Sequence, residues 1–355
     1  MFIYTFLISV CIFGAISQTT QAAPSNERLD DDQYDINITL SHQVLKENPK
    51  LWQVCTGVKM ERAEEYIVAF RAIYQKGIVH HLSAHVCGAP YSDGPYWDCT
   101  LHDHICADMG SWYPIDEWGR GANDWILPPD TGVVIGGRYG GKYIVLQVHR
   151  KDDFANYIET ATVPVSGMTL TVQRSRPQYE VGQLVLGNYG KLPAGVENYT
   201  TDSSCPWTRP QPIRLLAYSL HAHNLGKCVS GYLIKDGKWI EIGRGNPAYP
   251  EYRFSVWPRN MYVNTGDIMA SRCLYSNPGD KEVKFGYQHE DEMCNVYLHY
   301  AFPYGLDQSY RHMDCGQDAE TYHWEDHFRD IPADSTRPDG NTDQARAGLF
   351  RSADY

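Results

Sequence analysis

The sequence is short of positive charge, and beyond its first residues it has no long apolar run. Lys and Arg total 31 against 43 for Asp and Glu, so the 355-residue chain carries a formal net charge of −12. A general nucleic-acid binder needs basic patches that neutralise phosphates, so we expect no nucleic-acid partner. No later run approaches the roughly 20 apolar residues of a membrane helix, so we expect no membrane span in the mature chain.

Helical periodicity and internal repeats are also missing. No amphipathic pattern of three helical turns occurs, and no segment recurs at a fixed period. Short apolar runs instead alternate with turn residues, and the chain holds 26 Tyr, 30 Gly and 20 Pro, which favours β structure. We expect strands at residues 66–73, 78–84, 132–135, 143–149, 169–173, 214–221, 229–234, 238–242, 267–275, 283–287 and 295–301.

This pattern predicts an all-β protein made of β-sandwiches with many turns. The best internal boundary is the polar, proline-containing segment 174–182, almost midway along the chain. We therefore expect an N-terminal sandwich at 37–175 and a C-terminal sandwich at 176–330. An acidic leader at 24–36 and a flexible tail at 331–355 would flank them.

The N-terminus has the features of an export signal. Residues 1–16 are apolar, and small residues follow at Ala22 and Ala23, which indicates a signal peptide at 1–23; a membrane anchor is the alternative. We therefore expect the protein in the secretory pathway, in the secretory granule lumen or outside the cell. The sequons at Asn37 and Asn198 would then be glycosylation sites.

The cysteine count also suits an exported protein, because disulfides persist in oxidising compartments. The chain has ten cysteines, and Cys11 lies in the predicted signal peptide. The mature chain would then have an odd number, which allows at most four intrachain bridges and leaves one thiol.

Five of the histidines in or near predicted strands are candidate metal ligands. His221 and His223 are two residues apart, so in a strand they point to the same face, as two ligands of one metal must. His80 and His81 are neighbours and should point to opposite faces unless a bulge redirects one of them. His149 ends a further strand. Ordinary surface histidines are the alternative interpretation.

Met293 lies beside Cys294 and just before a predicted strand. Methionine is usually core filler. As a ligand it would indicate a soft ion, above all Cu(I), and a disulfide at Cys294 would fix its backbone. His85, on the same run as His81, is a weaker candidate ligand.

These residues resemble the peptidylglycine α-hydroxylating monooxygenases, over roughly residues 40–330. The resemblance rests on the following segments: His80-His81, 147–149, 221–223, 291–295 and the longer stretch 221–247. Dopamine β-hydroxylase and its relatives share the copper ligands but carry extra domains. This chain has no room for those domains or for the lyase domain that follows the hydroxylase in bifunctional forms. It is therefore expected to be a single-function hydroxylase.

The resemblance implies two tandem antiparallel β-sandwiches, jelly-roll-like and stapled by disulfides, that face each other across a cleft. It also implies two coppers per chain, one on each sandwich. The first, an electron-transfer copper, would be held in the N-terminal sandwich by His80, His81 and His149. The second, where O2 is bound and activated, would be held in the C-terminal sandwich by His221, His223 and Met293.

The implied reaction hydroxylates the α carbon of a C-terminal glycine in a peptide. Its co-substrates are O2 and ascorbate, and its substrates are glycine-extended peptides such as prohormone or neuropeptide products. This is the first step of peptide C-terminal amidation, and a separate lyase would complete the second step.

The resemblance also suggests residues that contact the substrate. Asn295 and Tyr297 match family residues beside the substrate, and Gln147 matches a residue of the cleft. Two residues before His221 the family has an arginine that helps hold the peptide carboxylate, and this chain has Ser219. A serine offers no bidentate cationic contact, so the way the carboxylate is held differs here.

A disulfide framework follows from the same resemblance. Cys228 falls where the family usually has an apolar residue, so we expect it to be the buried thiol left over. The implied bridges are Cys55–Cys99, Cys87–Cys106, Cys205–Cys315 and Cys273–Cys294.

Three alternatives stay open at this stage. A related copper hydroxylase acting on an amine is kept in view by Ser219. A secreted copper-binding protein without turnover would take up metal and consume no O2. A zinc hydrolase is disfavoured, because Met is a poor zinc ligand and no nearby carboxylate stands out as a general base.

Overall fold

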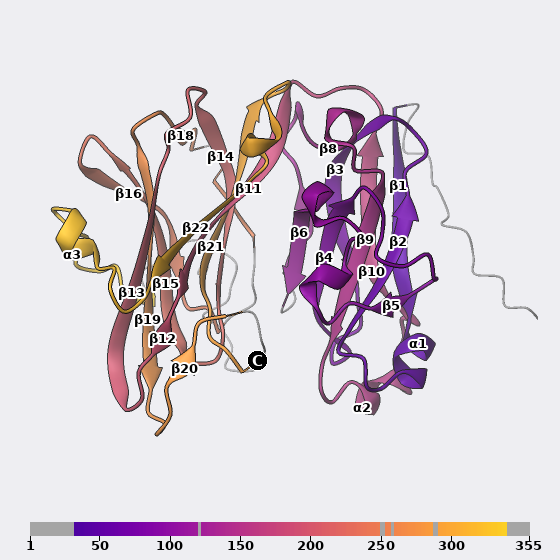
Figure 1. Ribbon diagram of the computed structural model, residues 1–355, viewed down its shortest axis with the longest axis horizontal. Coiled ribbons are helices and arrows are strands. Elements are labelled where there is room, and N and C mark those ends of the chain that lie inside the picture. Colours follow the sequence, from indigo (N-terminus) through magenta and orange to yellow (C-terminus); the bar gives the residue numbers. More distant parts are fainter. Residues whose placement is uncertain (1–31, 120–121, 249–252, 257–258, 287–289, 339–355) are drawn as a thin grey trace, which may run out of the picture.

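The computed structural model describes residues 32–119, 122–248, 253–256, 259–286 and 290–338. The predicted signal peptide, Cys11 and the end of the predicted tail lie outside these residues. Within them the protein is all-β, with two sandwiches side by side (Figure 1). The helices are short, as expected: α1 (His42–Glu47), α2 (Ala155–Ile158), α3 (Trp324–His327) and the 3-10 turns η1 (His102–His104), η2 (Met109–Ser111), η3 (Gly137–Tyr139) and η4 (Gln308–Tyr310).

The N-terminal sandwich packs β1-β10-β3-β8 against the five-stranded sheet β5-β2-β9-β4-β6. One apolar core, which includes Ile38, Leu82, Val148 and Leu170, fills the space between the two sheets. Its strands are β1 (Gln33–Ser41), β2 (Gln53–Lys59), β3 (Glu64–Ile73), β4 (Val79–Cys87), β5 (Trp97–Asp98), β6 (Tyr113–Gly119), β7 (Trp125–Ile126), β8 (Thr131–Gly136), β9 (Tyr143–Arg150) and β10 (Val165–Gln173).

The C-terminal sandwich packs β11-β21-β14-β17 against the four-stranded sheet β13-β19-β15-β16. Its core includes Leu184, Leu220, Val229 and Leu298. Its strands are β11 (Tyr179–Tyr189), β12 (Lys191–Leu192), β13 (Val196–Pro206), β14 (Ile213–Ala222), β15 (Gly226–Lys235), β16 (Lys238–Gly245), β17 (Phe254–Ser255), β18 (Tyr262–Val263), β19 (Ile268–Asn277), β20 (Val283–Lys284), β21 (Cys294–Pro303) and β22 (His312–Asp318).

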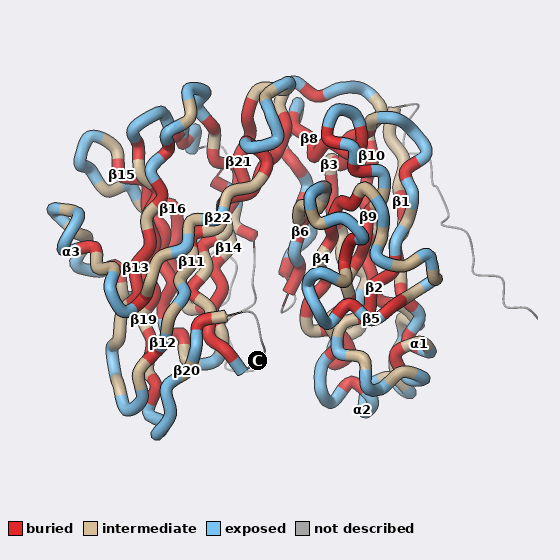
Figure 2. Tube along the Cα trace, viewed as in Figure 1, coloured by how far each residue is buried: buried red, intermediate tan, exposed pale blue. Residues whose placement is uncertain are grey.

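The two sandwiches share one continuous sheet. β8 and β11 pair in parallel where Tyr179 lies opposite Thr131, and β22 also runs parallel to β11, so the sheets are not purely antiparallel. The Tyr139 hydroxyl donates to Glu180 Oε2 at 2.9 Å across the same junction. Buried residues continue through this contact, so the two bodies face each other directly (Figure 2).

Two predicted boundaries need correction. β1 begins at Gln33 and pairs with β10 as far as Gln173, so residues 33–36 are strand rather than leader. Residues 331–338 pack onto the C-terminal sandwich rather than forming part of a flexible tail, because Ser335 is buried and the Asp334 carboxylate pairs with Arg244 at 2.7 Å. The boundary segment 174–182 also overlaps the start of β11.

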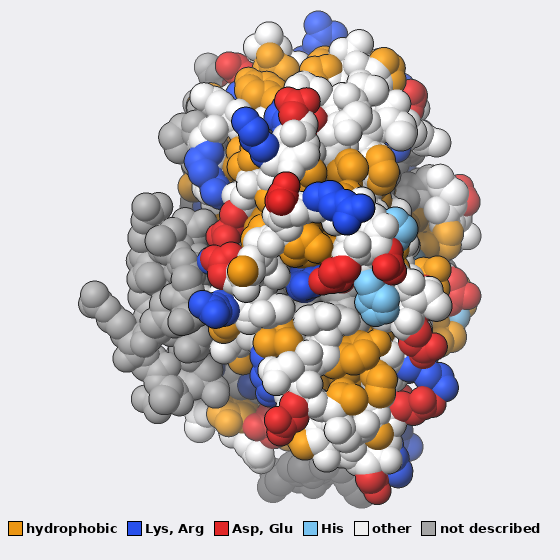
Figure 3. Space-filling view, turned by 90° about the vertical axis from the view of Figure 1, so that its left-hand side faces the viewer, with side chains coloured by type: hydrophobic (Ala, Val, Ile, Leu, Met, Phe, Trp, Pro, Cys, Tyr) orange, Lys and Arg blue, Asp and Glu red, His pale blue; other side chains and the backbone are white. Residues whose placement is uncertain are grey.

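All four implied disulfides are present, and the Cys228 thiol is buried 3.8 Å from the Ser335 carbonyl oxygen. No described helix is long and apolar enough to cross a membrane. The outer face of the C-terminal sandwich carries acidic and basic side chains intermixed (Figure 3). The bridges are Cys55–Cys99, Cys87–Cys106, Cys205–Cys315 and Cys273–Cys294.

Candidate metal centres

The first histidine set is brought together by a β-bulge. Leu82 of β4 and Val148 of β9 enter the core, so His81 and His149 point to the opposite face and lie directly opposite each other. The register shifts between Val79 and His81, which leaves His80 as the extra residue of the strand. The bulge that the adjacent pair required is therefore present.

This bulge makes a three-nitrogen site. His80, His81 and His149 each offer one ring nitrogen, and these atoms all lie within 4.8 Å of one another. The ring centroids of His80 and His81 are 4.1 Å apart, and those of His80 and His149 are 5.2 Å apart. Imidazole nitrogen suits copper, so the donor set fits the metal that the sequence predicted.

His85 does not join this set. Its Nδ1 accepts a hydrogen bond from Trp112 Nε1 at 3.2 Å. Burial lowers the pKa of His85 to about 3, with a smaller effect from neighbouring His102. His85 is therefore a neutral core histidine, and the weaker candidate of the sequence is not a ligand here.

The second set is carried by β14 and the start of β21. Leu220 and Ala222 enter the core, so Ser219, His221 and His223 lie on the other face. That face is turned toward the N-terminal sandwich, and the rings of His221 and His223 have centroids 5.2 Å apart. Same-face placement of the two histidines is confirmed.

Hydrogen bonds hold His223 in one orientation. Its Nδ1 lies 2.6 Å from the Asp291 carbonyl oxygen, and a carbonyl only accepts, so Nδ1 carries the proton and Nε2 carries the lone pair. The buried Glu292 carboxylate accepts from the backbone N–H of His223 at 3.1 Å and of Leu225 at 2.9 Å. Burial raises the pKa of Glu292, and these hydrogen bonds oppose that rise.

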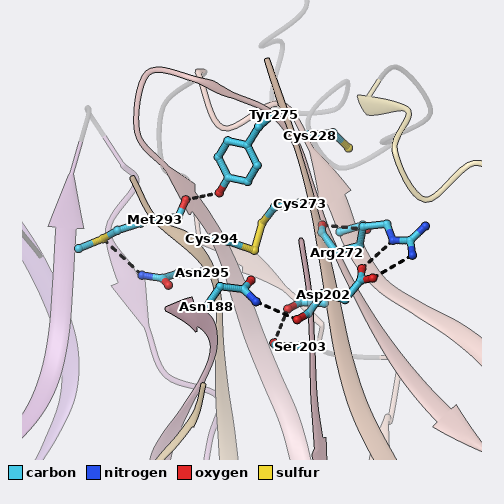
Figure 4. Close-up of a disulfide and its surroundings, with 12 residues drawn as sticks. Asn188, Asp202, Ser203, Cys228, Arg272, Cys273, Tyr275, Met293, Cys294 and Asn295 are labelled. Carbon is cyan, nitrogen blue, oxygen red and sulfur yellow. Dashed lines mark hydrogen bonds and ion pairs between the residues drawn. A yellow bond between two sulfur atoms is a disulfide. The ribbon is translucent and has the colours of Figure 1, made fainter. Parts of the chain in front are cut away.

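Met293 is fixed at its backbone and at its sulfur (Figure 4). Its carbonyl oxygen accepts from the Tyr275 hydroxyl at 2.5 Å, and Cys294 is bonded to Cys273 in the neighbouring sheet. Asn295 Nδ2 lies 3.5 Å from the thioether sulfur. Ala222 pairs with Cys294, so the residues just beyond, His223 and Met293, meet at the same end of the sheet. A thioether beside two imidazoles suits Cu(I).

The two sets face each other across the junction of the sandwiches. The ring centroids of His81 and His221 are only 5.9 Å apart, although they belong to different sandwiches. A small pocket next to His221 lies between the sandwiches, and Glu117 of β6 reaches it from the N-terminal side. The arrangement suits two metal ions that act on one bound molecule.

The predicted substrate residues fall into two groups. Tyr297 lines the pocket, and its hydroxyl accepts from Asn295 Nδ2 at 3.0 Å. Gln147 points from β9 on the same side as His149, but its amide donates to Gln53 Oε1 at 2.8 Å and to the Cys99 carbonyl oxygen at 3.0 Å. Gln147 is not among the described residues that line the pocket.

Five pocket residues were not predicted from the sequence: Glu117, Gln183, Leu220, Arg253 and His299. His299 follows Asn295 and Tyr297 at a spacing of two on β21, so strand alternation could have identified it. Arg253 lies just before β17 in an irregular segment with no periodicity, so no local signal marks it.

Two sandwiches with a three-histidine set facing a two-histidine and methionine set define the class of protein as a two-domain redox metalloprotein of the copper type. Comparison with known proteins agrees. Residues 37–155 match the family described as copper type II ascorbate-dependent monooxygenase, N-terminal domain, and residues 179–328 match the C-terminal domain of that family.

Individual relatives lie in the same family. The chain is 31% identical to the peptidylglycine alpha-amidating monooxygenase of Rattus norvegicus, over 87% of this chain and 30% of that protein. It is 33% identical to peptidyl-glycine alpha-amidating monooxygenase A of Xenopus laevis, over 72% and 27%. It is 24% identical to human dopamine beta-hydroxylase, over 67% and 41%. The chain belongs to the copper type II, ascorbate-dependent monooxygenase family, and it spans less than a third of the two amidating relatives.

Proposed function

We propose that the protein hydroxylates the α carbon of a C-terminal glycine in peptides, the first step of C-terminal amidation. The observation that carries this is the pair of facing ligand sets, with the rings of His81 and His221 5.9 Å apart and a pocket beside His221. The relatives with 31% and 33% identity are named for peptidylglycine amidation, which favours this substrate over others.

Two coppers per chain would occupy the sets. His80, His81 and His149 would hold one, and His221, His223 and Met293 the other. When bound, copper supplies one-electron redox chemistry and O2 activation. In the reaction one oxygen atom of O2 would be inserted into a Cα–H bond of the glycine to give a hydroxyl group, the other would leave as water, and ascorbate would provide the two electrons and two protons.

The residues of this chain fix the geometry of that chemistry. The Asp291 carbonyl and the Glu292 carboxylate hold His223 with Nε2 available. The Cys273–Cys294 bridge and the Tyr275 hydroxyl hold Met293. Tyr297 and Asn295 border the place where the substrate would lie. A separate lyase would then release the amide, and the protein would act in the secretory pathway, the granule lumen or outside the cell.

The test is O2 uptake by copper-loaded protein with ascorbate and a short peptide ending in Val-Gly. We expect uptake with the free carboxylate and none with the same peptide ending in an amide. Met293→Ile should abolish uptake. Met261→Ile, a substitution of a buried methionine in the C-terminal core, should retain it. Copper binding at two per chain with no peptide-dependent uptake would refute the proposal.

An amine hydroxylase is the second candidate. On β14 this chain has Ser219 where the family has a cationic arginine. The Glu117 carboxylate reaches the pocket, where it could pair with an amine. Dopamine beta-hydroxylase is also among the relatives. O2 uptake driven by a phenylethylamine, and lost in Glu117→Gln, would favour this function over peptide hydroxylation.

A further inference from the structure

The pocket beside His221 is lined by one acidic residue, Glu117, and by one arginine, Arg253. Ser219, His221, Tyr297 and His299 line one side of it, and Arg253 contributes its guanidinium from the segment between β16 and β17. Burial lowers the pKa of His299 well below its usual range, and nearby Arg253 adds to that effect, so His299 is neutral. Arg253 is therefore the one side chain with a permanent positive charge among the described residues that line the pocket.

Packing fixes the Arg253 side chain. The residue is only 8% exposed, and its guanidinium lies 4.3 Å from the centre of the Trp125 ring. Nη2 donates to the Asp116 carboxylate and to the Glu117 carbonyl oxygen, the latter at 3.1 Å. The Arg253 backbone N–H donates to Asn123 Oδ1 at 3.0 Å. A guanidinium held in this way loses little freedom when it binds an anion.

Part of this guanidinium has no acceptor. The Nε–H of Arg253 is buried and has no hydrogen-bond partner within the described part of the chain. A buried polar donor without a partner costs free energy, more so in a charged group. Arg253 also lines the pocket, so an anion bound within hydrogen-bond distance of this N–H would remove that cost.

Strand geometry places such an anion next to the reacting carbon. Ser219 is two residues from His221 on the same face of β14, a step of about 6.6 Å, and Tyr297 lies opposite Ser219 on β21. Ser219 lines the same pocket as Arg253. In a C-terminal glycine the carboxylate is one bond from Cα.

We propose that Arg253 binds the carboxylate of the substrate, so that the cation of this site comes from the β16–β17 segment instead of from β14. The proposal rests on the proposed function for the identity of the substrate, a peptide with a free C-terminal carboxylate. It assigns to Arg253 a binding role beyond its contact with the N-terminal sandwich.

The charge balance of the pocket gives the proposal a second consequence. Arg253 is shared with Asp116, so the substrate carboxylate competes with a carboxylate of the protein for the same cation. Burial raises the pKa of Asp116 and lowers the pKa of Arg253, so each charge is already held at a cost. Neutralising Asp116 should therefore strengthen substrate binding.

The experiment compares Arg253→Gln with Asp116→Asn in the copper-loaded protein. If Arg253 binds substrate, Arg253→Gln raises KM for the glycine-extended peptide by about 10- to 100-fold with little change in kcat, the loss expected for a charge-assisted hydrogen bond. Asp116→Asn leaves KM unchanged or lowers it. Arg253→Lys keeps the charge without the guanidinium Nε–H and gives an intermediate KM.

Equal effects of Arg253→Gln and Asp116→Asn on KM would overturn the proposal, because both variants break the same contact between the sandwiches. Calorimetric binding without ascorbate separates the two proposals. Binding of the carboxylate peptide, and not its amide, that is lost in Arg253→Gln supports this one even if turnover is absent. Carboxylate binding that survives in both Arg253→Gln and Arg253→Lys overturns it even if the enzyme hydroxylates the peptide.

Discussion

The disulfide Cys273–Cys294 should matter to the metal centre beyond its effect on stability. It joins β19 to the first residue of β21, next to Met293, and closes a loop with a sequence separation of 21. Removing a bridge around a loop of this size costs about 3 kcal/mol in the chain-entropy account. We expect Cys273→Ala/Cys294→Ala to lose about that much in the free energy of unfolding.

Cys87–Cys106 provides a matched control. Its sequence separation of 19 predicts nearly the same loss, about 3 kcal/mol, but it lies far from Met293 along the chain. Urea unfolding would measure both losses. X-ray absorption of the Cu(I) protein would then report the copper–sulfur contact, which should weaken only in the Cys273/Cys294 variant.

The reasoning would be refuted by a specific result. If both double variants lose similar stability and both retain the copper–sulfur signal and full activity, the bridge does not position Met293. The Tyr275 hydroxyl at 2.5 Å from the Met293 carbonyl would then suffice to hold it.

Three further predictions follow from the structure. His81→Ala should reduce bound copper from two per chain to one, whereas the control His85→Ala should leave two. Metal analysis after dialysis measures the copper content. Equal losses of copper in the two variants would contradict the assignment of His81 as a ligand. The pKa of His85 is lowered to about 3, so between pH 6.5 and 3 the unfolded chain binds a proton at His85 that the folded chain does not. The free energy of unfolding should therefore fall as the pH drops through this range, by up to about 1.4 kcal/mol per pH unit. If the pH dependence of the free energy of unfolding is unchanged in His85→Gln, the prediction is wrong. Asp202 accepts hydrogen bonds from Arg272 Nε at 2.7 Å and from Nη2 at 3.0 Å in the C-terminal sandwich. Asp202→Ala leaves the buried guanidinium without this partner, so it should lower the free energy of unfolding, measured with denaturant, by about 3–5 kcal/mol. A decrease below about 1 kcal/mol would contradict the structure.

Short apolar runs between turn residues were enough to predict much of the fold. Each of the eleven expected strands overlaps an observed one, because short apolar runs bounded by turn residues mark strands that contribute to a core. Several strands were not predicted, among them β1, β2, β6, β11, β13 and β22. In β13 the buried positions are polar: Thr201, Asp202 and Ser203 are fully buried. Asp202 is satisfied by Arg272 on the neighbouring strand, and such a long-range ion pair leaves no local pattern.

The candidate site was predictable to the extent that it follows strand geometry or the family resemblance. Same-face placement of His221 and His223 is a local property, and the bulge at His80 was a stated requirement of the adjacent pair. The closeness of His81 to His221 depends on how the sandwiches meet, which no local pattern encodes. Arg253 was missed for the same reason, since its position depends on Asp116 and Trp125 of the other sandwich.

The most direct test of the central claim is the fate of labelled oxygen. Copper-loaded protein, ascorbate and ¹⁸O2 would be incubated with a short peptide ending in glycine, and the product analysed by mass spectrometry. The account predicts one ¹⁸O atom on the glycine α carbon of the product, and no such product with Met293→Ile. Unchanged peptide, or a hydroxyl group at any other carbon, would contradict it.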